Sequence, residues 1–368
     1  MTRSTRDLED ARRRLERWLA DELPDGAAPS VSALTAPGAN GMSSETLLFD
    51  ATWEENGGRR SEALVARIAP EPSAVPVFPH YDLQRQFDVM RLVRAHSDVP
   101  VPQVFWVEPH GSAVGSPCFV MERIDGLVPP DVMPYPFGDN WLSDASHDEQ
   151  LLLQESSVAL LTSLHGIDEA EKRFGFLASS ATGDSTLRRH VADQWAYYNW
   201  AAQGLRSPLI ERCFAWLDEN WPQHPGPTRL SWGDARIGNV MYRNFRPVAV
   251  LDWEMAGLGP PEIDLAWFIF LHRFFEDLCA QYGLAGMPHF LRRADVASTY
   301  EALSGYTPRD LDWFTMYAAL RHGIVMHRVQ QRTIHFGEAT MPEDPDDLIL
   351  HRATLEAMLA GTYAPAGA

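Results

Sequence analysis

The chain has 368 residues, of which 45% are hydrophobic and 22% are charged, a composition typical of folded globular proteins. Its length suggests roughly two domains. The formal net charge of −19 argues against nucleic acid as a partner, because binding to a phosphate backbone depends on clustered Lys and Arg side chains. An acidic surface would favour a cationic small molecule, although acidity is also an ordinary feature of soluble proteins.

Apolar segments and cysteines bear on the location of the protein. No apolar segment follows the N-terminus, and the longest apolar run, Leu265 to Leu271, is far shorter than a membrane span. The three cysteines, Cys118, Cys213 and Cys279, are far apart and have apolar neighbours, so we expect buried thiols and not a disulfide framework or a zinc site. We therefore expect a soluble, cytoplasmic protein without membrane contact. The sequence predicts no particular oligomeric state.

Lysine occurs once, at Lys172. A P-loop needs a lysine directly after its second glycine, and the residues around Lys172 do not provide this context, so P-loop nucleotide binding is excluded. The sequence also lacks the GxGxxG motif of dinucleotide-binding folds and the GxSxG motif of hydrolases. His322 and His327 are five residues apart, which is a poor helical spacing for a shared metal, so packing or surface roles are expected.

The first part of the chain has the pattern of a small α+β lobe of about 120 residues. Apolar residues at helical spacing predict a helix over residues 4–23. Short runs of strand-forming residues, bounded by turn residues, predict strands over 31–34, 46–53, 63–68, 104–107 and 118–121. A second helix is expected over 82–96, before the prolines at 100 and 102.

The second part of the chain is mainly helical. The proline-rich passage after Arg123 has no periodicity, so we place the domain boundary there and predict domains over 1–122 and 123–368. Helices are predicted over 147–165, 186–203, 208–220, 261–278, 296–303, 308–331 and 344–359. One β-hairpin is expected among them, with strands over 239–242 and 247–253.

This hairpin carries the chemistry that the sequence suggests. Asp234 and Asn239 lie before or at the start of its first strand, and Asp252 lies near the end of its second. In-line phosphoryl transfer needs a group that orients the attacking hydroxyl, and Asp234 suits this role. Mg²⁺ prefers a few hard oxygen ligands together with phosphate and water, so the amide of Asn239 and the carboxylate of Asp252 are sufficient protein ligands.

These residues also carry a family resemblance. The run WGDARIGN at 232–239, followed by VLDWE at 250–254 and EIDLA at 262–266, resembles the HGDxxxxN and LDWE…DLA motifs of the aminoglycoside phosphotransferase family. It is particularly similar to the branch that includes the kinase-like domains of certain acyl-CoA dehydrogenase fusion proteins. The order and spacing of the motifs match, as does the layout from about residue 31 to the C-terminal helices.

The resemblance implies a bilobal, protein-kinase-like fold of the α+β class, with a small β-rich N-terminal lobe and a larger, mainly helical C-terminal lobe. It further implies an ATP- and Mg²⁺-dependent enzyme that transfers the γ-phosphoryl group to a hydroxyl of a small molecule, either aminoglycoside-like or another hydroxylated metabolite. Asp234 would be the catalytic base, and Asn239 and Asp252 would hold Mg²⁺. The alternative is that these acidic residues cap turns or pair with Arg236 or Arg243.

The resemblance in the small lobe is less literal. The glycine-containing loop at 38–44, which ends in Ser43 and Ser44, could cover donor phosphates, although it could also be an ordinary turn. The family usually has a basic residue on the third strand that pairs with a Glu on the following helix. Here Arg67 and Gln86 occupy these positions. Arg can neutralise phosphate as Lys does, and the amide oxygen of Gln86 could accept from its guanidinium.

Four further residues have predicted roles: Glu122, Ile124, Asp264 and Trp232. The backbone near Glu122 and Ile124 could meet adenine, with a plain linker as the alternative. Asp264 is expected to brace the catalytic loop or to cap its own helix. Trp232 replaces the usual His before Gly-Asp and, with Gln86, motivates the second hypothesis: a catalytically weak or inactive kinase-like protein that binds nucleotide.

Overall fold

A computed structural model describes residues 6–37, 44–71 and 75–363 of the protein. The chain divides into two compact units, which we describe separately. The first comprises Met1–Ala95 and Val101–Ile124, and the second comprises His96–Pro100 and Asp125–Ala368. That residues 1–122 and 123–368 fold as separate domains stays a prediction.

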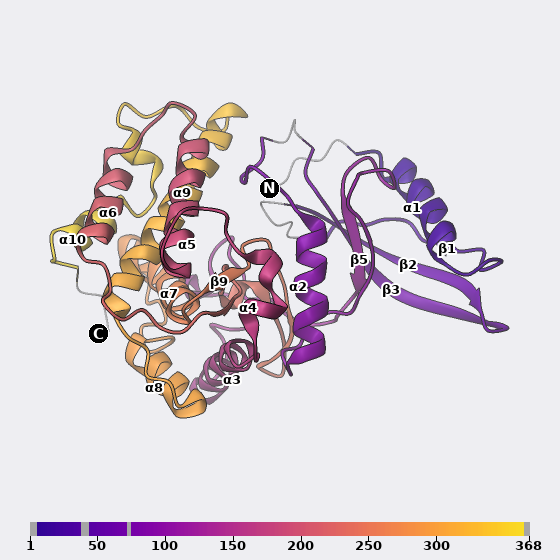
Figure 1. Ribbon diagram of the computed structural model, residues 1–368, viewed down its shortest axis with the longest axis horizontal. Coiled ribbons are helices and arrows are strands. Elements are labelled where there is room, and N and C mark those ends of the chain that lie inside the picture. The colour runs from indigo at the N-terminus through magenta and orange to yellow at the C-terminus, as the bar shows by residue number, and fades with distance from the viewer. Residues whose placement is uncertain (1–5, 38–43, 72–74, 364–368) are drawn as a thin grey trace. The chain divides into compact units, whose positions relative to one another are not determined.

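The first unit is built on a five-stranded antiparallel sheet with the strand order β1-β2-β3-β5-β4 (Figure 1). The strands are β1 Ser30–Val31, β2 Glu45–Glu55, β3 Gly58–Ile68, β4 Val104–Glu108 and β5 Cys118–Glu122. Each of the five predicted strands is present, although the first, predicted over 31–34, covers only Ser30–Val31. The β2–β3 hairpin is longer than predicted because Asn56 and Gly57, both with positive φ (52° and 79°), form a two-residue turn that lets both strands continue to it.

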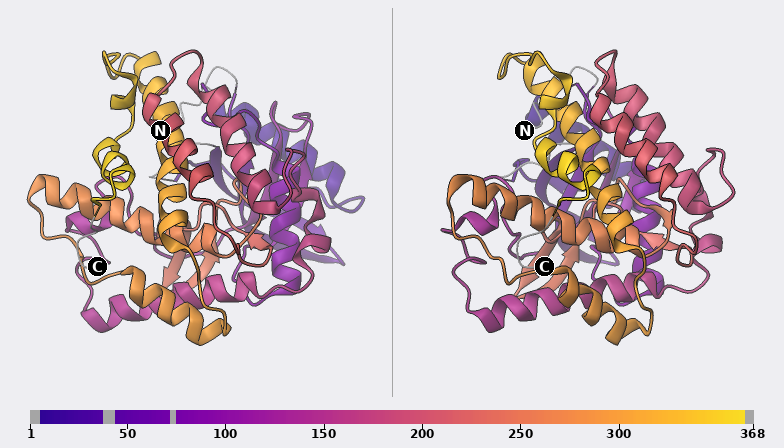
Figure 2. Two further views of the ribbon diagram at one scale, coloured as in Figure 1. Left: turned by 60° about the vertical axis from the view of Figure 1, so that its left-hand side comes forward. Right: turned by 90° about the vertical axis from the view of Figure 1, so that its left-hand side faces the viewer.

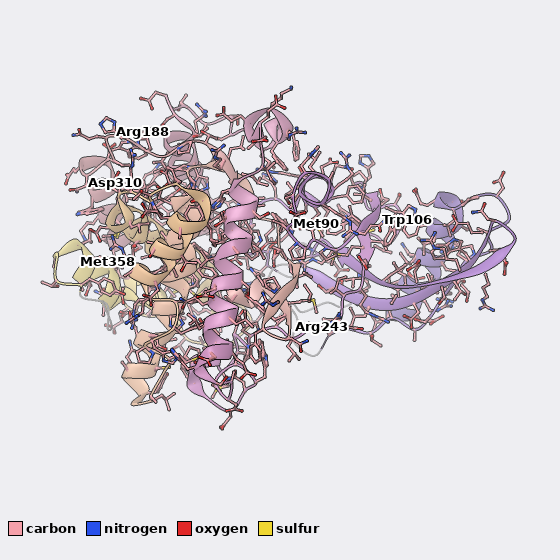
Figure 3. All side chains as sticks on the ribbon, turned by 90° about the horizontal axis from the view of Figure 1, so that it is seen from below. Met90, Trp106, Arg188, Arg243, Asp310 and Met358 are labelled. Carbon is pink, nitrogen blue, oxygen red and sulfur yellow. The ribbon has the colours of Figure 1, made fainter. Side chains whose placement is uncertain are left out.

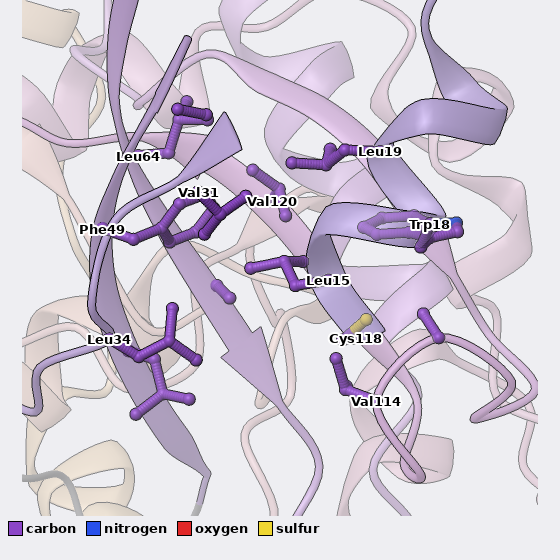
Figure 4. Close-up of a cluster of buried hydrophobic side chains, with 14 of the residues drawn as sticks. Leu15, Trp18, Leu19, Val31, Leu34, Phe49, Leu64, Val114, Cys118 and Val120 are labelled. Carbon is purple, nitrogen blue, oxygen red and sulfur yellow. The ribbon is translucent and has the colours of Figure 1, made fainter. Parts of the chain in front are cut away.

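Helix α1, Leu8–Glu22, covers one face of this sheet. Its buried apolar residues Leu15, Trp18 and Leu19 pack in one core with strand residues that include Phe49, Leu64, Cys118 and Val120 (Figure 4). Trp106 of β4, labelled in Figure 3, packs against the same core and meets Trp53 of β2 edge to face, with ring centroids 6.2 Å apart. The predicted N-terminal helix is therefore an integral part of the first unit.

Helix α2, Leu83–His96, packs against the other face. Successive side chains of a strand point to opposite faces, so Phe119 faces away from the core that Cys118 and Val120 share with α1. Phe119 meets Phe87 of α2, with ring centroids 6.3 Å apart. Arg67 is paired with Phe119 across β3 and β5, so it also lies on the α2 side of the sheet.

The second unit is mainly helical (Figure 2). Its helices are α3 His147–His165, α4 Ala170–Arg173, α5 Thr186–Ala202, α6 Pro208–Glu219, α7 Glu262–Tyr282, α8 Arg293–Ser304, α9 Leu311–His335 and α10 Arg352–Leu359. Helix α9 packs against α5, α6 and α7. In the described part of the chain, no helix has both the length and the apolar character that crossing a membrane requires. All three cysteines are free and buried, as predicted.

The C-terminal segment differs from the single helix predicted over 344–359. It contains a short 3-10 helix, Pro345–Leu348, and then α10. The side chain of Asp346 is buried and accepts hydrogen bonds from Ser207 Oγ (2.5 Å) and Leu209 N (3.2 Å). These tertiary hydrogen bonds hold the first turn against α6, so helical propensity alone predicts this segment wrongly.

Two small sheets lie among the helices. The predicted hairpin is confirmed as β7 Val240–Arg243 and β8 Arg246–Val250. A second pair, β6 Arg229–Ser231 with β9 Gly257–Gly259, was not predicted, because each strand has three residues and β9 contains two glycines. The expectation of one hairpin as the only β structure of this part is therefore wrong. The segment between β6 and β7 contains Asp234 and Asn239.

Candidate active site

The carboxylate of Asp234 lies at the centre of a compact group of polar side chains in the β6–β7 loop. Asn239 Nδ2 donates to Asp234 Oδ2 at 2.6 Å and to the Asp234 carbonyl at 3.1 Å. Trp267 Nε1 of α7 donates to Asp234 Oδ1 at 2.7 Å. Because the Asn239 amide nitrogen makes both bonds to Asp234, its amide oxygen is the part of the side chain that remains suited to a metal.

Arg236 adds a positive charge to this group. Its Nε lies 3.2 Å from the Asp234 carboxylate, and its Nη1 forms an ion pair with Asp131. Burial alone would lower the pKa of Arg236, but the charges of Asp234 and Asp131 outweigh this effect and raise it. Asp234 therefore does pair with Arg236, which the sequence analysis considered as the alternative to a catalytic role. It does not exclude a role as base, since each carboxylate oxygen can accept more than one hydrogen bond.

Arg236 and Trp267 are not among the predicted site residues. A positive side chain two residues after Asp234 is visible in the sequence and could have indicated Arg236. Trp267 lies 33 residues from Asp234, and one apolar residue among many in α7 gives no local signal. Only the tertiary structure brings its indole nitrogen to the carboxylate.

Asp264 braces the loop, as predicted. Its side chain is fully buried and accepts from Ser231 Oγ (2.7 Å), Trp232 N (2.8 Å) and Gly233 N (2.9 Å). His165 Nε2 also donates to it at 3.0 Å. Burial would raise the pKa of Asp264, but the hydrogen bonds from His165, Gly233 and Ser231 outweigh burial and lower it. The backbone before Asp234 is thus tied to the start of α7.

Gly233 has a conformation that the loop requires. Its φ is +90°, and a Cβ atom added there would lie 2.0 Å from the carbonyl oxygen of Met255, which is closer than any real contact. A side chain would therefore force the backbone next to Asp234 to move.

We expect Gly233→Ala to lower the free energy of unfolding by about 2–4 kcal/mol, because it adds a backbone clash to the strain of positive φ. Urea denaturation would measure the change. Gly283→Ala is the matched control, since Gly283 has a φ of +68° and nothing within 4 Å of the added Cβ. Its loss should be about 1 kcal/mol. Equal losses in the two variants would contradict the close approach to Met255.

The backbone of Asp252 is tied to the same loop. Leu251 N donates to the Asn239 carbonyl at 2.9 Å. Trp232 Nε1 donates to the carbonyls of Leu251 (2.9 Å) and Asp252 (3.1 Å). Trp232, which stands where the family usually has His, thus supplies hydrogen bonds behind the loop. Asp252 itself has a φ of 57°, an uncommon conformation that Asp tolerates better than most residues and that often occurs at functional sites.

The donor set around this loop fits a magnesium ion chemically. The structure brings the side chains of Asp234 and Asn239 into contact and ties the backbone of the residue before Asp252 to Asn239, so these residues lie at one end of the β7–β8 hairpin. In the described residues, no group of three or more His, Cys, Asp and Glu side chains could hold a metal. An amide and one carboxylate form a smaller set, which leaves most of the coordination shell to phosphate and water.

The predicted phosphate-binding residues lie in the first unit. Arg67 Nη1 donates to Thr46 Oγ1 at 2.9 Å, on the sheet face that α2 covers. Gln86 of α2 is buried, with 4% of its surface exposed. Ser44 is fully buried at the start of β2. Ser43 and the preceding residues of the predicted phosphate loop lie outside the described part of the chain.

The predicted adenine-binding backbone lies at the end of β5. Glu122 N donates to the Gln103 carbonyl at 2.8 Å, and Glu122 Oε2 accepts from Gln103 N at 3.2 Å. Arg123 N donates to the Ala63 carbonyl at 3.0 Å. Ile124, two residues beyond the strand, is partly buried. The sheet therefore fixes the backbone up to Arg123.

Comparison with known proteins places these observations in a family context. Residues 49–302 match the family model described as the phosphotransferase enzyme family. Acyl-CoA dehydrogenase family member 11 of Rattus norvegicus is 26% identical over 260 residues, which is 69% of this chain and 30% of that protein. The chain thus spans about a third of the length of this relative.

Solved structures share the fold. A candidate aminoglycoside phosphotransferase of Ralstonia eutropha aligns with a TM-score of 0.64 and 20% identity, over 95% of this chain and 97% of that chain. The aminoglycoside phosphotransferase APH(4)-Ia, in a ternary complex with ADP and hygromycin B, aligns with a TM-score of 0.53 and 16% identity, over 95% and 99% of the two chains. The predicted kinase-like fold of the α+β class, with a β-rich N-terminal part and a mainly helical remainder, is confirmed.

Proposed function

Because the chain belongs to the phosphotransferase enzyme family, we propose that it transfers the γ-phosphoryl group of ATP to a hydroxyl group of a small molecule, with Mg²⁺ as cofactor. The observation that carries this proposal is the hydrogen-bonded pair of Asp234 and Asn239 in the β6–β7 loop, with Asp252 tied to the same loop. Such an arrangement provides the base and metal-holding oxygens that in-line phosphoryl transfer needs.

In this proposal Asp234 accepts the proton of the acceptor hydroxyl and orients it. The Oδ1 and Oδ2 atoms are already held by Trp267 and Asn239, so the carboxylate is fixed before the acceptor arrives. Arg236 places a positive charge beside Asp234, where negative charge on a transferring phosphoryl group would be stabilised. The Asn239 amide oxygen and the Asp252 carboxylate would hold Mg²⁺, which when bound neutralises donor phosphate charge.

The proposed nucleotide contacts come from the first unit. Arg67 would neutralise donor phosphate, and Gln86 would support it by hydrogen bonding. Ser43 and Ser44 would belong to a loop that covers phosphates through backbone N–H groups. The backbone near Glu122 and Ile124 would meet adenine. The position of Arg67 on the α2 face of the sheet supports the first of these assignments, because Gln86 is a buried residue of that helix.

The acceptor is proposed only as a class. An aminoglycoside-like compound is supported by fold similarity to an enzyme solved with hygromycin B. Another hydroxylated metabolite is supported by sequence similarity to acyl-CoA dehydrogenase family proteins. The net charge of −19 mildly favours a cationic acceptor.

An assay of ADP release from Mg²⁺-ATP, over a panel of hydroxylated acceptors, tests the function. We expect at least one acceptor to stimulate ADP release, and we expect ATP to raise the melting temperature. Nucleotide binding without stimulation by any aminoglycoside, amino alcohol or hydroxyacyl compound would favour the second hypothesis, a catalytically weak or inactive nucleotide-binding protein. The replacement of the usual Glu by Gln86 is the observation that favours this hypothesis. Absence of nucleotide binding would contradict both.

A further inference from the structure

Trp267 makes a direct hydrogen bond to the proposed base. Its side chain is 3% exposed, and its Nε1 donates to Asp234 Oδ1 at 2.7 Å. It lies one turn after Asp264, so the same end of α7 holds both the loop backbone and the Asp234 carboxylate. A tryptophan N–H fixes the rotation of a carboxylate without adding a formal charge.

Arg321 lies against the face of this tryptophan. The carbon of its guanidinium is 4.5 Å from the Trp267 ring centroid, and its Nη2 donates to the Gly233 carbonyl at 3.0 Å. A cation over an indole face is attracted by the ring quadrupole. It also draws electron density from the ring, which makes the indole N–H a stronger donor. Arg321 of α9 therefore contacts both the residue before Asp234 and the donor to Asp234.

The burial of Arg321 is unusual enough to need an explanation. The residue is 1% exposed, and its Nε and Nη1 have no hydrogen-bond partner among the described residues. Burial lowers the pKa of Arg321, and the opposing attraction of the Asp264 and Asp234 carboxylates does not offset it. A purely structural position would be filled more favourably by an apolar side chain, because a buried charge without full hydrogen bonding costs free energy.

We propose that Trp267 and Arg321 form a positioning pair for Asp234. Trp267 sets the rotation of the carboxylate, and Arg321 holds the indole ring and the Gly233 carbonyl in a fixed relation. This inference rests on the proposed function, since it assigns to the pair the orientation of the base toward the acceptor hydroxyl. In this proposal neither residue contacts the acceptor or the nucleotide, so both act through Asp234.

The first test is Trp267→Phe, which keeps an aromatic ring over Arg321 and removes the N–H donor. We expect kcat to fall about 10- to 100-fold, because a small displacement of a catalytic group has effects of this size, while the KM for ATP stays within about twofold. Trp313→Phe is the matched control: Trp313 of α9 is also buried and donates to the Leu217 carbonyl at 3.0 Å. It should lose stability without a comparable fall in kcat.

The second test is Arg321→Met, which removes the charge and keeps most of the length. Its matched control is Arg328→Met, because Arg328 is also buried on α9 and lies 4.7 Å from the ring centroid of Trp200. We expect kcat to fall in Arg321→Met and to stay close to the wild-type value in Arg328→Met. Because both residues act on one carboxylate, Trp267→Phe combined with Arg321→Met should lower kcat by less than the product of the single effects.

A third measurement is independent of turnover. In protein labelled with ¹⁵N-tryptophan, the signal that disappears in Trp267→Phe identifies the Trp267 indole N–H. We expect this signal to move upfield in Asp234→Ala, while the Trp313 signal stays in place, because only the first loses a carboxylate acceptor.

The outcomes separate the inference from the proposed function. Equal kcat values for Trp267→Phe and Trp313→Phe, or a Trp267 signal that does not respond to Asp234→Ala, would overturn the positioning pair. If no acceptor supports turnover in the wild-type protein, the proposed function fails, and the NMR measurement still decides whether Trp267 holds Asp234.

Discussion

Asp234→Asn should abolish phosphoryl transfer and leave nucleotide binding nearly intact. The amide has the shape of the carboxylate but cannot accept the proton of an acceptor hydroxyl. Removing a general base lowers kcat by about 10²- to 10⁴-fold. Arg236 loses one of its two carboxylate partners and keeps Asp131, so its charge stays in the loop.

Steady-state kinetics with Mg²⁺-ATP and calorimetric titration of a non-hydrolysable ATP analogue would measure the two effects. Asp312→Asn is a suitable control, because Asp312 lies on α9 with 89% of its side chain exposed and pairs with Arg293. It should retain wild-type kcat. Unchanged turnover in Asp234→Asn would contradict the assignment of the base, and a large loss of nucleotide affinity would indicate that Asp234 acts on the donor.

Asp264→Asn should have the largest effect on stability. The buried carboxylate accepts hydrogen bonds from Ser231, Trp232, Gly233 and His165. An amide can accept with one of its two heteroatoms only, so its NH₂ group would face N–H or O–H donors. Breaking one side of a buried charged network costs about 3–5 kcal/mol. We also expect turnover per folded molecule to fall, since the backbone of Gly233 precedes the base.

The stability that Asp264→Asn removes should depend on pH in a definite direction. In the folded protein the pKa of Asp264 is lowered from its ordinary value of 3.8, so the folded state binds its proton less readily than the unfolded state. Its carboxylate therefore stabilises the fold above about pH 4, and this contribution is lost as the pH falls through the folded-state pKa. The difference between wild type and Asp264→Asn should be largest near neutral pH.

Urea denaturation at several pH values would check both statements. Asp346→Asn provides the comparison, because Asp346 is also buried and accepts hydrogen bonds from Ser207 and Leu209. These residues do not belong to the β6–β7 loop. We expect it to destabilise the protein without a specific loss of kcat. A stable, fully active Asp264→Asn protein would contradict the bracing role.

The sequence predicts most of the helices and the five strands of the first unit, because their apolar residues recur at clear spacings. It fails where tertiary contacts decide the local structure. The segment from 344 onward breaks because Asp346 bonds to α6, and β6 and β9 form because two short segments meet across the fold. In both cases the two interacting segments are far apart in the sequence, so a local pattern cannot reveal the contact.

The candidate site likewise contains residues that the local sequence predicts and residues that only the tertiary structure reveals. Asp234 and Asn239 are five residues apart and belong to one motif, so their proximity follows from local sequence. For Asp264 the sequence left two roles open, bracing the loop or capping its own helix, and the structure shows the bracing hydrogen bonds. Trp267 and Arg321 have no such marker, because each is one side chain of a largely buried helix. Their relation to Asp234 depends on how α7 and α9 pack.

The core between α1 and the sheet bears on where this protein can be divided. The match to the family model begins at residue 49, inside β2, whereas the apolar face of the sheet is covered by Leu15, Trp18 and Leu19 of α1. A fragment that begins at residue 49 would expose Leu64 and Val120 to water and would lack the first residues of β2. The first residue of the family-model match is therefore not the boundary of the folding unit. A fragment that keeps this core must include α1.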